Sequence, residues 1–217
     1  MKHYAIIVAG GSGLRMKSAI PKQFMLLNDL PVLMHTILKF SNSAHQPAII
    51  LVLHPDLHDL WKSMCEKHHF ITPHVLVNGG EERFHSVKNG LAETTENSII
   101  AIHDAVRPLL STQLIDTSFE RAKENENAVP VVKPSDSVRK VSELESKIIN
   151  RDEIALVQTP QTFVSNQLIT AYQQSYSNTF TDDASVVEKA GFKINLIDGE
   201  RSCLLYTSPS PRDRQKS

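Results

Sequence analysis

The chain has 217 residues, of which 41% are hydrophobic, and its 23 basic and 24 acidic side chains leave a net charge of −1. This length is typical of one domain with a substantial core, while the balanced charge argues against a nucleic-acid-binding surface and no apolar run approaches the roughly 20 residues of a membrane span. Two cysteines in no disulfide or zinc pattern, and a first strand with no signal peptide before it, lead us to expect a cytoplasmic protein.

The first strand and the loop after it are the most informative segment. An apolar run from Tyr4 to Ala9 gives way to Gly10-Gly11-Ser12-Gly13, and two cations, Arg15 and Lys22, follow closely. Such a run is typical of a buried strand that enters a tight loop, where backbone N–H groups can approach an anion. The pattern predicts a triphosphate-binding site. A plain strand-to-helix turn with surface cations is the alternative.

The loop matches neither common phosphate-binding fingerprint. The chain has no Walker sequence G-x-x-x-x-G-K-[ST], and Met16 occupies the position of the third glycine of a dinucleotide fingerprint. The pattern A-G-G-x-G-x-R-M followed by P-K-Q instead resembles the signature of nucleotidyltransferases that load a nucleoside monophosphate onto a sugar or polyol phosphate. That motif marks a superfamily rather than a substrate.

Farther along the chain, strand-like runs alternate with helical patterns. The predicted strands span 49–53, 74–77, 98–103 and 128–132, and the predicted helices span 32–41, 56–68, 82–94 and 112–124. This alternation predicts an α/β fold with a mainly parallel sheet flanked by helices. Ligands collect beyond the carboxyl ends of such strands, where NGGEERFHS (78–86) and HDAVRP (103–108) join the glycine loop. We therefore expect the binding site at that edge.

Residues 134–163 interrupt the alternation. Strand-like pieces at 137–141 and 147–150 flank a polar turn, which predicts a two-stranded arm that leaves the main sheet. Because a lone hairpin is marginal in water, we expect the arm to pack on a second subunit, with packing on its own domain as the alternative. Helical patterns resume at 165–175 and 183–190, and Gly191 predicts a C-terminal stop.

Eight sequence strings, in one order, resemble those of a known enzyme family. They are AGGSGLRM, PKQF, NGGEERFHSV, HDAVRP, SDSVRK, NRD, QTPQTF and TDDAS. From about residue 4 to 201 the chain is similar to the 2-C-methyl-D-erythritol 4-phosphate cytidylyltransferases of the non-mevalonate isoprenoid pathway. The resemblance implies a Rossmann-like nucleotidyltransferase sheet with a protruding β-arm (about 134–158). It also implies CMP transfer from CTP to the polyol phosphate, magnesium, and a homodimer through the arm.

On the nucleotide side, the resemblance implies a role for each matching residue. Arg15 and Lys22 would be catalytic cations that hold the triphosphate and stabilise the transition state, and Ala9 to Gly13 would be the backbone cradle. The loop that contacts cytosine and ribose would comprise Gly79, Gly80, Arg83 and Ser86. Asp104 and Ala105 would lie near the ribose, and Asp104 would also contact the magnesium ion.

On the acceptor side, the resemblance implies that Asp104 lies near the acceptor phosphate and that Arg151 positions the acceptor as a catalytic residue. Thr181 and Asp182 would belong to the polyol-side pocket. Ser137 stands where the family usually has threonine, and its hydroxyl is retained. The arm would cross to a second subunit and complete that subunit's site.

The resemblance ends after Arg201. The family normally has a lysine that helps to position the acceptor phosphate where this chain has Leu205, and CLLYTSPSPRD, from Cys203, resembles a translated sequencing adapter. We therefore expect a cytidylyltransferase domain at 1–201, a non-native tail at 202–217, and little or no activity in this chain. A divergent natural terminus is the alternative.

Other functions remain open at this point. A ribitol-5-phosphate cytidylyltransferase shares the glycine loop, HDAVRP and TPQ, although the segments 150–152 and 181–185 favour the erythritol enzyme. A dinucleotide-binding dehydrogenase is disfavoured by Met16 and by the missing acid at the end of a second strand. A truncated chain that binds nucleotide without catalysis is the third alternative.

Overall fold

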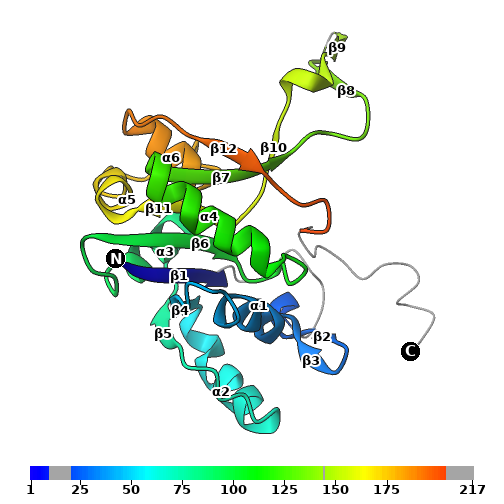
Figure 1. Ribbon diagram of the computed structural model, residues 1–217. Coiled ribbons are helices and arrows are strands. Elements are labelled where there is room, and N and C mark those ends of the chain that lie inside the picture. Colours follow the sequence, from blue (N-terminus) through cyan, green and yellow to red (C-terminus); the bar gives the residue numbers. More distant parts are fainter. Residues whose placement is uncertain (10–20, 144, 204–217) are drawn as a thin grey trace, which may run out of the picture.

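The protein is described by a computed structural model at residues 1–9, 21–143 and 145–203. An eight-stranded sheet forms its centre, in the order β10-β7-β11-β6-β1-β4-β5, with β12 paired to β7 (Figure 1). The strands are β1 (Lys2–Ala9), β4 (Ala48–Leu53), β5 (Val75–Asn78), β6 (Ser98–Asp104), β7 (Asn127–Val132), β10 (Leu156–Val157), β11 (Gln161–Val164) and β12 (Leu196–Asp198). The predicted α/β class is confirmed.

The core of the sheet is parallel. β1 lies between β4 and β6, with Ile6 opposite Ile50 on one side and Ile102 on the other. β11 lies between β6 and β7 and is antiparallel to both. β10 pairs antiparallel with β7 at the edge of the sheet. The sheet is therefore mixed around a largely parallel core. β11 was not predicted from the sequence, because its four residues carry no period that distinguishes a strand from a loop.

Helices cover both faces of the sheet. One layer, whose apolar core includes Ile7, holds α1 (Val32–Ser41), α2 (His58–Lys67) and α4 (Thr112–Asn125). The other layer, whose core includes Ile6, holds α3 (Arg83–Leu91), α5 (Ser165–Ala171) and α6 (Asp183–Lys189). Successive strand side chains point to opposite faces, so the fully buried run of β1 feeds both cores.

The predicted helices agree with the structure in order and differ at their ends. α1 has the predicted bounds, whereas the segment predicted to start α2 at residue 56 forms a 3₁₀ turn, η2 (Pro55–Leu57). α6 stops before Gly191, whose φ of 91° suits glycine at a helix end. The short elements η1 (Lys22–Phe24), β2 (Leu26–Leu27), β3 (Leu30–Pro31) and η3 (Arg151–Glu153) were not predicted. Among the described helices, none is long and apolar enough to cross a membrane.

The predicted arm is present as a separate hairpin. Its strands are β8 (Val138–Val141) and β9 (Ser146–Ile149), which pair with each other and not with the main sheet. Figure 1 shows the hairpin projecting from the body of the molecule beyond β7 and β10. Two of its apolar side chains are largely exposed, Val141 at 74% and Ile148 at 73%.

Candidate active site at the carboxyl edge of the sheet

The loops after the central strands are tied to one another at the carboxyl edge. Gly79 donates its backbone N–H to the carbonyl of Leu53 at 2.8 Å, and Ala105 donates to the carbonyl of Val8 at 3.1 Å. The first bond holds the loop after β5 against the end of β4, and the second holds the loop after β6 against the end of β1, which pairs with β4. Ala9 closes β1 there. The predicted cradle residues Gly10, Gly11, Ser12 and Gly13, and the predicted cation Arg15, lie outside the described residues.

The Gly79–Gly80 loop folds closely onto the start of α3. A Cβ atom at Gly80 would lie 2.4 Å from Cβ of His85, so a side chain at this position would push the loop away from the helix. The Gly80 N–H donates to Oγ of Ser86 at 3.0 Å. Ser86 is buried and holds the loop, and its hydroxyl still has a hydrogen to donate. The structure thus brings these three predicted nucleotide-binding residues together.

Asp104, at the end of β6, lies between two arginines. Nε of Arg107 donates to Oδ2 of Asp104 at 3.0 Å, and Nε of Arg83 lies 3.5 Å from Oδ1. Burial alone would raise the pKa of Asp104, but the positive charges of Arg83 and Arg107 outweigh it and lower that pKa below its usual value. The carboxylate is therefore ionised at neutral pH.

Arg83 makes its strongest contacts with Asp183. Its Nη1 and Nη2 donate to the two carboxylate oxygens of Asp183 at 2.9 and 2.7 Å. Asp183 is fully buried and also accepts a hydrogen bond from the hydroxyl of Tyr172 at 2.6 Å. Asp183 was not among the predicted site residues, and its neighbour Asp182 was, because nothing in the string TDDAS says which acid turns inward.

Asp182 has a structural place in the same segment. Its Oδ1 accepts from the backbone N–H of Ser185 at 2.9 Å and caps α6, and its Oδ2 accepts from Nε2 of Gln161 at 2.9 Å. Thr181 is exposed just before the helix, and its N–H donates to Oγ of Ser185. Both predicted polyol-side residues therefore adjoin Asp183.

A buried histidine supports the loop that carries Asp104. Nε2 of His103 lies 3.2 Å from the carbonyl oxygen of Arg107, which can only accept, so Nε2 carries the proton. Nδ1 then accepts from the hydroxyl of Thr159 at 2.9 Å, and Thr159 Oγ1 accepts from the N–H of Asp104. Burial, the largest cause, lowers the pKa of His103 to about 4, so the ring is neutral at pH 7.

The segment that ends at Cys203 packs against this edge. Nη1 of Arg107 donates to the carbonyl of Cys203 at 3.1 Å, and Gln158 bonds to both backbone groups of Glu200. The Glu200 carboxylate accepts from the N–H and the hydroxyl of Ser111, the N-cap of α4. Of the predicted tail at 202–217, Ser202 and Cys203 are described, and Cys203 is fully buried in the core. Residues 204–217, Leu205 included, lie outside the described residues.

Three predicted residues lie apart from this network. Lys22 is half-buried in η1, and its side-chain role stays a prediction. Ser137 and Arg151 are exposed at the base of the arm, where Nη1 of Arg151 donates to the carbonyl of Ser135 at 3.1 Å. Within a single chain, Ser137 and Arg151 therefore do not join the hydrogen-bond network around Asp104.

The described residues offer limited means to hold a metal ion. Among them, no group of three or more histidine, cysteine, aspartate or glutamate side chains is placed to bind one. Asp104 offers one carboxylate, and its Oδ1 is held only at 3.5 Å by Arg83. Magnesium prefers few protein carboxylates together with phosphate oxygens and water, so the site fits a magnesium ion that arrives with a triphosphate.

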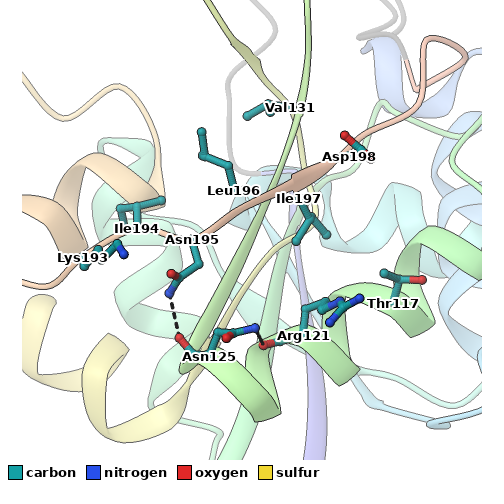
Figure 2. Close-up of a pocket in the computed structure, with 10 residues that line it drawn as sticks. All are labelled: Thr117, Arg121, Asn125, Val131, Lys193, Ile194, Asn195, Leu196, Ile197 and Asp198. Atoms are coloured by element: carbon teal, nitrogen blue, oxygen red, sulfur yellow. Dashed lines mark hydrogen bonds between the residues drawn. The ribbon is translucent and has the colours of Figure 1, made fainter.

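A separate groove lies on the surface away from these residues. It encloses about 680 Å³ between α4 and β12 (Figure 2). Asn195 donates to the carbonyl of Asn125 at 2.7 Å at one end of it, and Arg121 lines the helix side. None of the predicted site residues lines this groove.

The fold and the family of its relatives define the class of protein as a nucleotidyltransferase. The chain matches the 4-diphosphocytidyl-2C-methyl-D-erythritol synthase structure from Anaerococcus prevotii with a TM-score of 0.81 and 27% identity, covering 95% of this chain and 91% of that one. The 2-C-methyl-D-erythritol 4-phosphate cytidylyltransferase structure from Francisella tularensis matches with a TM-score of 0.78 and 29% identity, covering 100% and 97%.

The chain belongs to the family described as 2-C-methyl-D-erythritol 4-phosphate cytidylyltransferase, which matches residues 3–212. A Bacteroides thetaiotaomicron protein of that name is 44% identical over 209 residues, which cover 96% of this chain and 95% of that protein. The protein of the same name from Bacillus licheniformis is 32% identical over 212 residues, covering 96% and 92%. The resemblance seen in the sequence strings is confirmed.

Proposed function

We propose that this chain transfers CMP from CTP to 2-C-methyl-D-erythritol 4-phosphate. A phosphate oxygen of the acceptor attacks the α-phosphorus of CTP, the bond from that phosphorus to the bridging oxygen breaks, and pyrophosphate leaves. The product is 4-diphosphocytidyl-2-C-methyl-D-erythritol. The observation that carries the proposal is Asp104, ionised between two arginines at the sheet edge where the nucleotide loops meet, in a chain of this family.

Positioning and charge stabilisation account for the residues proposed to act. Two polyanions must meet, so cations aimed at the transferring phosphoryl group lower the barrier without a nucleophile from the protein. Lys22 and Arg15 are proposed for that role, with Ala9 to Gly13 as the backbone cradle. The Gly79–Gly80 loop, held by Ser86, is proposed to read the cytosine with backbone groups.

We assign the metal and acceptor contacts to the region around Asp104. A bound magnesium ion would neutralise charge on the phosphate oxygens, and Asp104 is the carboxylate proposed to orient it. Ala105 is proposed to contact the nucleotide beside it. Thr181 and Asp182 are proposed for the polyol side, which their connection to Asp183 at the start of α6 supports.

The arm is proposed to make the protein a homodimer. Ser137 and Arg151 are exposed at its base, and Val141 and Ile148 expose apolar surface along it. A second copy that received the arm would bury those apolar side chains and gain Arg151 and Ser137 for its acceptor site. The location proposed is the cytoplasm, because the free thiols of Cys65 and Cys203 suit a reducing compartment.

Pyrophosphate release tests the proposal directly. In the protein with a family-type ending we expect release with CTP plus 2-C-methyl-D-erythritol 4-phosphate, and little with UTP, because a polar base edge left unpaired discriminates strongly. The chain with its present ending should release little or none. A parallel assay replaces the erythritol phosphate with ribitol 5-phosphate. A titration with NAD tests whether the protein binds a dinucleotide, as the dehydrogenase alternative requires. Each assay is run on the unaltered chain and on a protein in which a family-type ending replaces the residues from Cys203 onward. Equal turnover with ribitol 5-phosphate, or no turnover in either protein, contradicts the proposal.

A further inference from the structure

Each of the three guanidinium nitrogens of Arg83 has a carboxylate partner, although its side chain is 32% exposed. Both terminal nitrogens donate to Asp183, and Nε lies toward Asp104. A guanidinium that makes a bidentate pair presents its planar fork in one direction only. The fork of Arg83 therefore faces the buried carboxylate of Asp183, although the arginine itself adjoins the Gly79–Gly80 loop.

Asp183 is anchored as firmly as its partner. It is the first residue of α6, has no solvent exposure, and accepts the Tyr172 hydroxyl. Burial, followed by the charge of Asp183, raises the pKa of Tyr172 well above its usual value, so the phenol keeps the proton that it donates. Release of Arg83 would leave this carboxylate desolvated with one neutral donor, which is strongly unfavourable.

A second contact joins the same two parts of the fold. Phe84, next to Arg83 in α3, stacks on Tyr172 with ring centroids 4.8 Å apart and on Phe180 at 5.6 Å. The start of α3 therefore contacts the segment between α5 and α6 through an ion pair and through aromatic packing. That segment leads directly to Thr181 and Asp182.

From these contacts we infer that Arg83 and Asp183 form a strut, a rigid ion pair that positions Asp104 and fixes the cytosine-side loop relative to the acceptor-side segment. Arg83 is thus a positioning residue and not a ligand of the nucleotide, and Asp183 is its partner in that role. The inference rests on the proposed cytidylyl transfer and deepens it. It replaces the role in cytosine and ribose contact that the family resemblance implies for Arg83.

A strut and a nucleotide ligand predict different kinetics for Arg83→Gln. If Arg83 positions Asp104, kcat falls about 100-fold, as for a displaced catalytic group, while the Kd for CTP measured by calorimetry rises by less than about threefold. If Arg83 binds the nucleotide, loss of a charged hydrogen bond weakens CTP binding about 10- to 100-fold. The two measurements are made on the protein whose pyrophosphate release has been established.

The double variant Arg83→Gln/Asp183→Asn sharpens the test. The strut predicts that Asp183→Asn alone lowers kcat as much as Arg83→Gln does. It also predicts that the double variant is no slower than Arg83→Gln, because both substitutions remove the same interaction. It also predicts that Arg83→Gln lowers Tm by about 10 °C and that the double variant regains part of it, because no buried charge is then unpaired.

The matched control is Arg121→Gln, which breaks the exposed pair between Arg121 and Glu124 on α4. It should leave kcat, Kd and Tm unchanged. CTP binding weakened 10-fold or more in Arg83→Gln, or kcat losses that multiply in the double variant, would overturn the strut while leaving the proposed reaction intact. Absence of pyrophosphate release in the unaltered protein and in its counterpart with a family-type ending would instead overturn the proposed reaction itself. The Tm comparison tests the ion pair in either case.

Discussion

The family resemblance places Arg83, at the carboxyl edge of the sheet, and Arg151, on the projecting arm, in the active site, yet the two regions hold their arginines differently. Arg83 and Arg107 bind carboxylates whose side chains are 0% and 24% exposed. Arg151 donates to one backbone carbonyl at the exposed base of the arm. The edge is organised within one chain, whereas the arm presents its residues to solvent.

This difference follows from where each region finds its partners. The edge is formed by strands and helices that are far apart in the sequence, and its paired polar groups lie next to the two apolar cores. The arm is a two-stranded hairpin whose pairing is confined to itself. The charged groups at the edge are therefore held in place before substrate binds. Residues on the arm become fixed only when the arm packs against another surface.

Loss of a cation should therefore cost far more at the edge than on the arm. Arg83→Gln leaves the buried carboxylate of Asp183 without its charge partner, and we expect a loss of about 3–5 kcal/mol in the free energy of unfolding. Arg151→Gln removes one exposed hydrogen bond, and we expect about 0–1 kcal/mol. Urea denaturation of both variants measures the difference, and similar midpoints would contradict the comparison.

The two predicted catalytic cations, Lys22 and Arg15, should matter for rate more than for nucleotide binding. Lys22→Ala and Arg15→Ala are each expected to lower kcat by about 10²–10³-fold, as is typical of charge that stabilises a transition state. CTP affinity should fall much less. Steady-state kinetics with parallel calorimetry separates the two quantities, and near-full turnover in either variant would mean that the glycine loop is not the reaction centre.

The buried edge should also make the fold sensitive to acid. The pKa of His103 is about 4 in the folded protein and near 6.5 when unfolded, so the unfolded chain binds the proton first as pH falls. Stability from this group is complete above pH 6.5 and is lost as pH falls toward 4, by about 3 kcal/mol in total. His103→Gln should flatten the unfolding free energy across that window. An unchanged slope would contradict the assignment of this histidine as neutral.

The pattern of the sequence predicted most of the parallel core because long apolar runs and helical periods are local signals. The bounds of α1 were predicted without error. The antiparallel β11 was missed because four residues between QTP and a helix have no period of their own. Its position between β6 and β7 depends on contacts with residues about 35 and 60 positions away, as in the pairs Thr162–Ala128 and Thr162–Ala101.

The site was predictable in its loops and less so in its pairings. Gly79, Gly80 and Ser86 come together as their shared motif implies. The pairing of Arg83 with Asp183 spans 100 positions and could not be read from either motif alone. Which of two adjacent acids is buried depends on the turn that starts α6, where Asp182 takes the cap and Asp183 faces inward.

The smallest expected effect on the fold comes from the arm, and it separates folding from assembly. Val141→Asp and Ile148→Asp place charges at side chains that are already 74% and 73% exposed, so the stability of a single chain should change by no more than about 0.5 kcal/mol. If the arm packs on a second copy, the same charges must be desolvated there, and the dimer should dissociate. Sedimentation velocity of the unaltered protein and the double variant measures this.

Leu196→Asp is the matched control, because Leu196 is an exposed apolar residue of β12 outside the arm, at 57%. A dimer that survives both arm charges, or an unaltered protein that is monomeric and fully active, would show that the arm completes no partner's site.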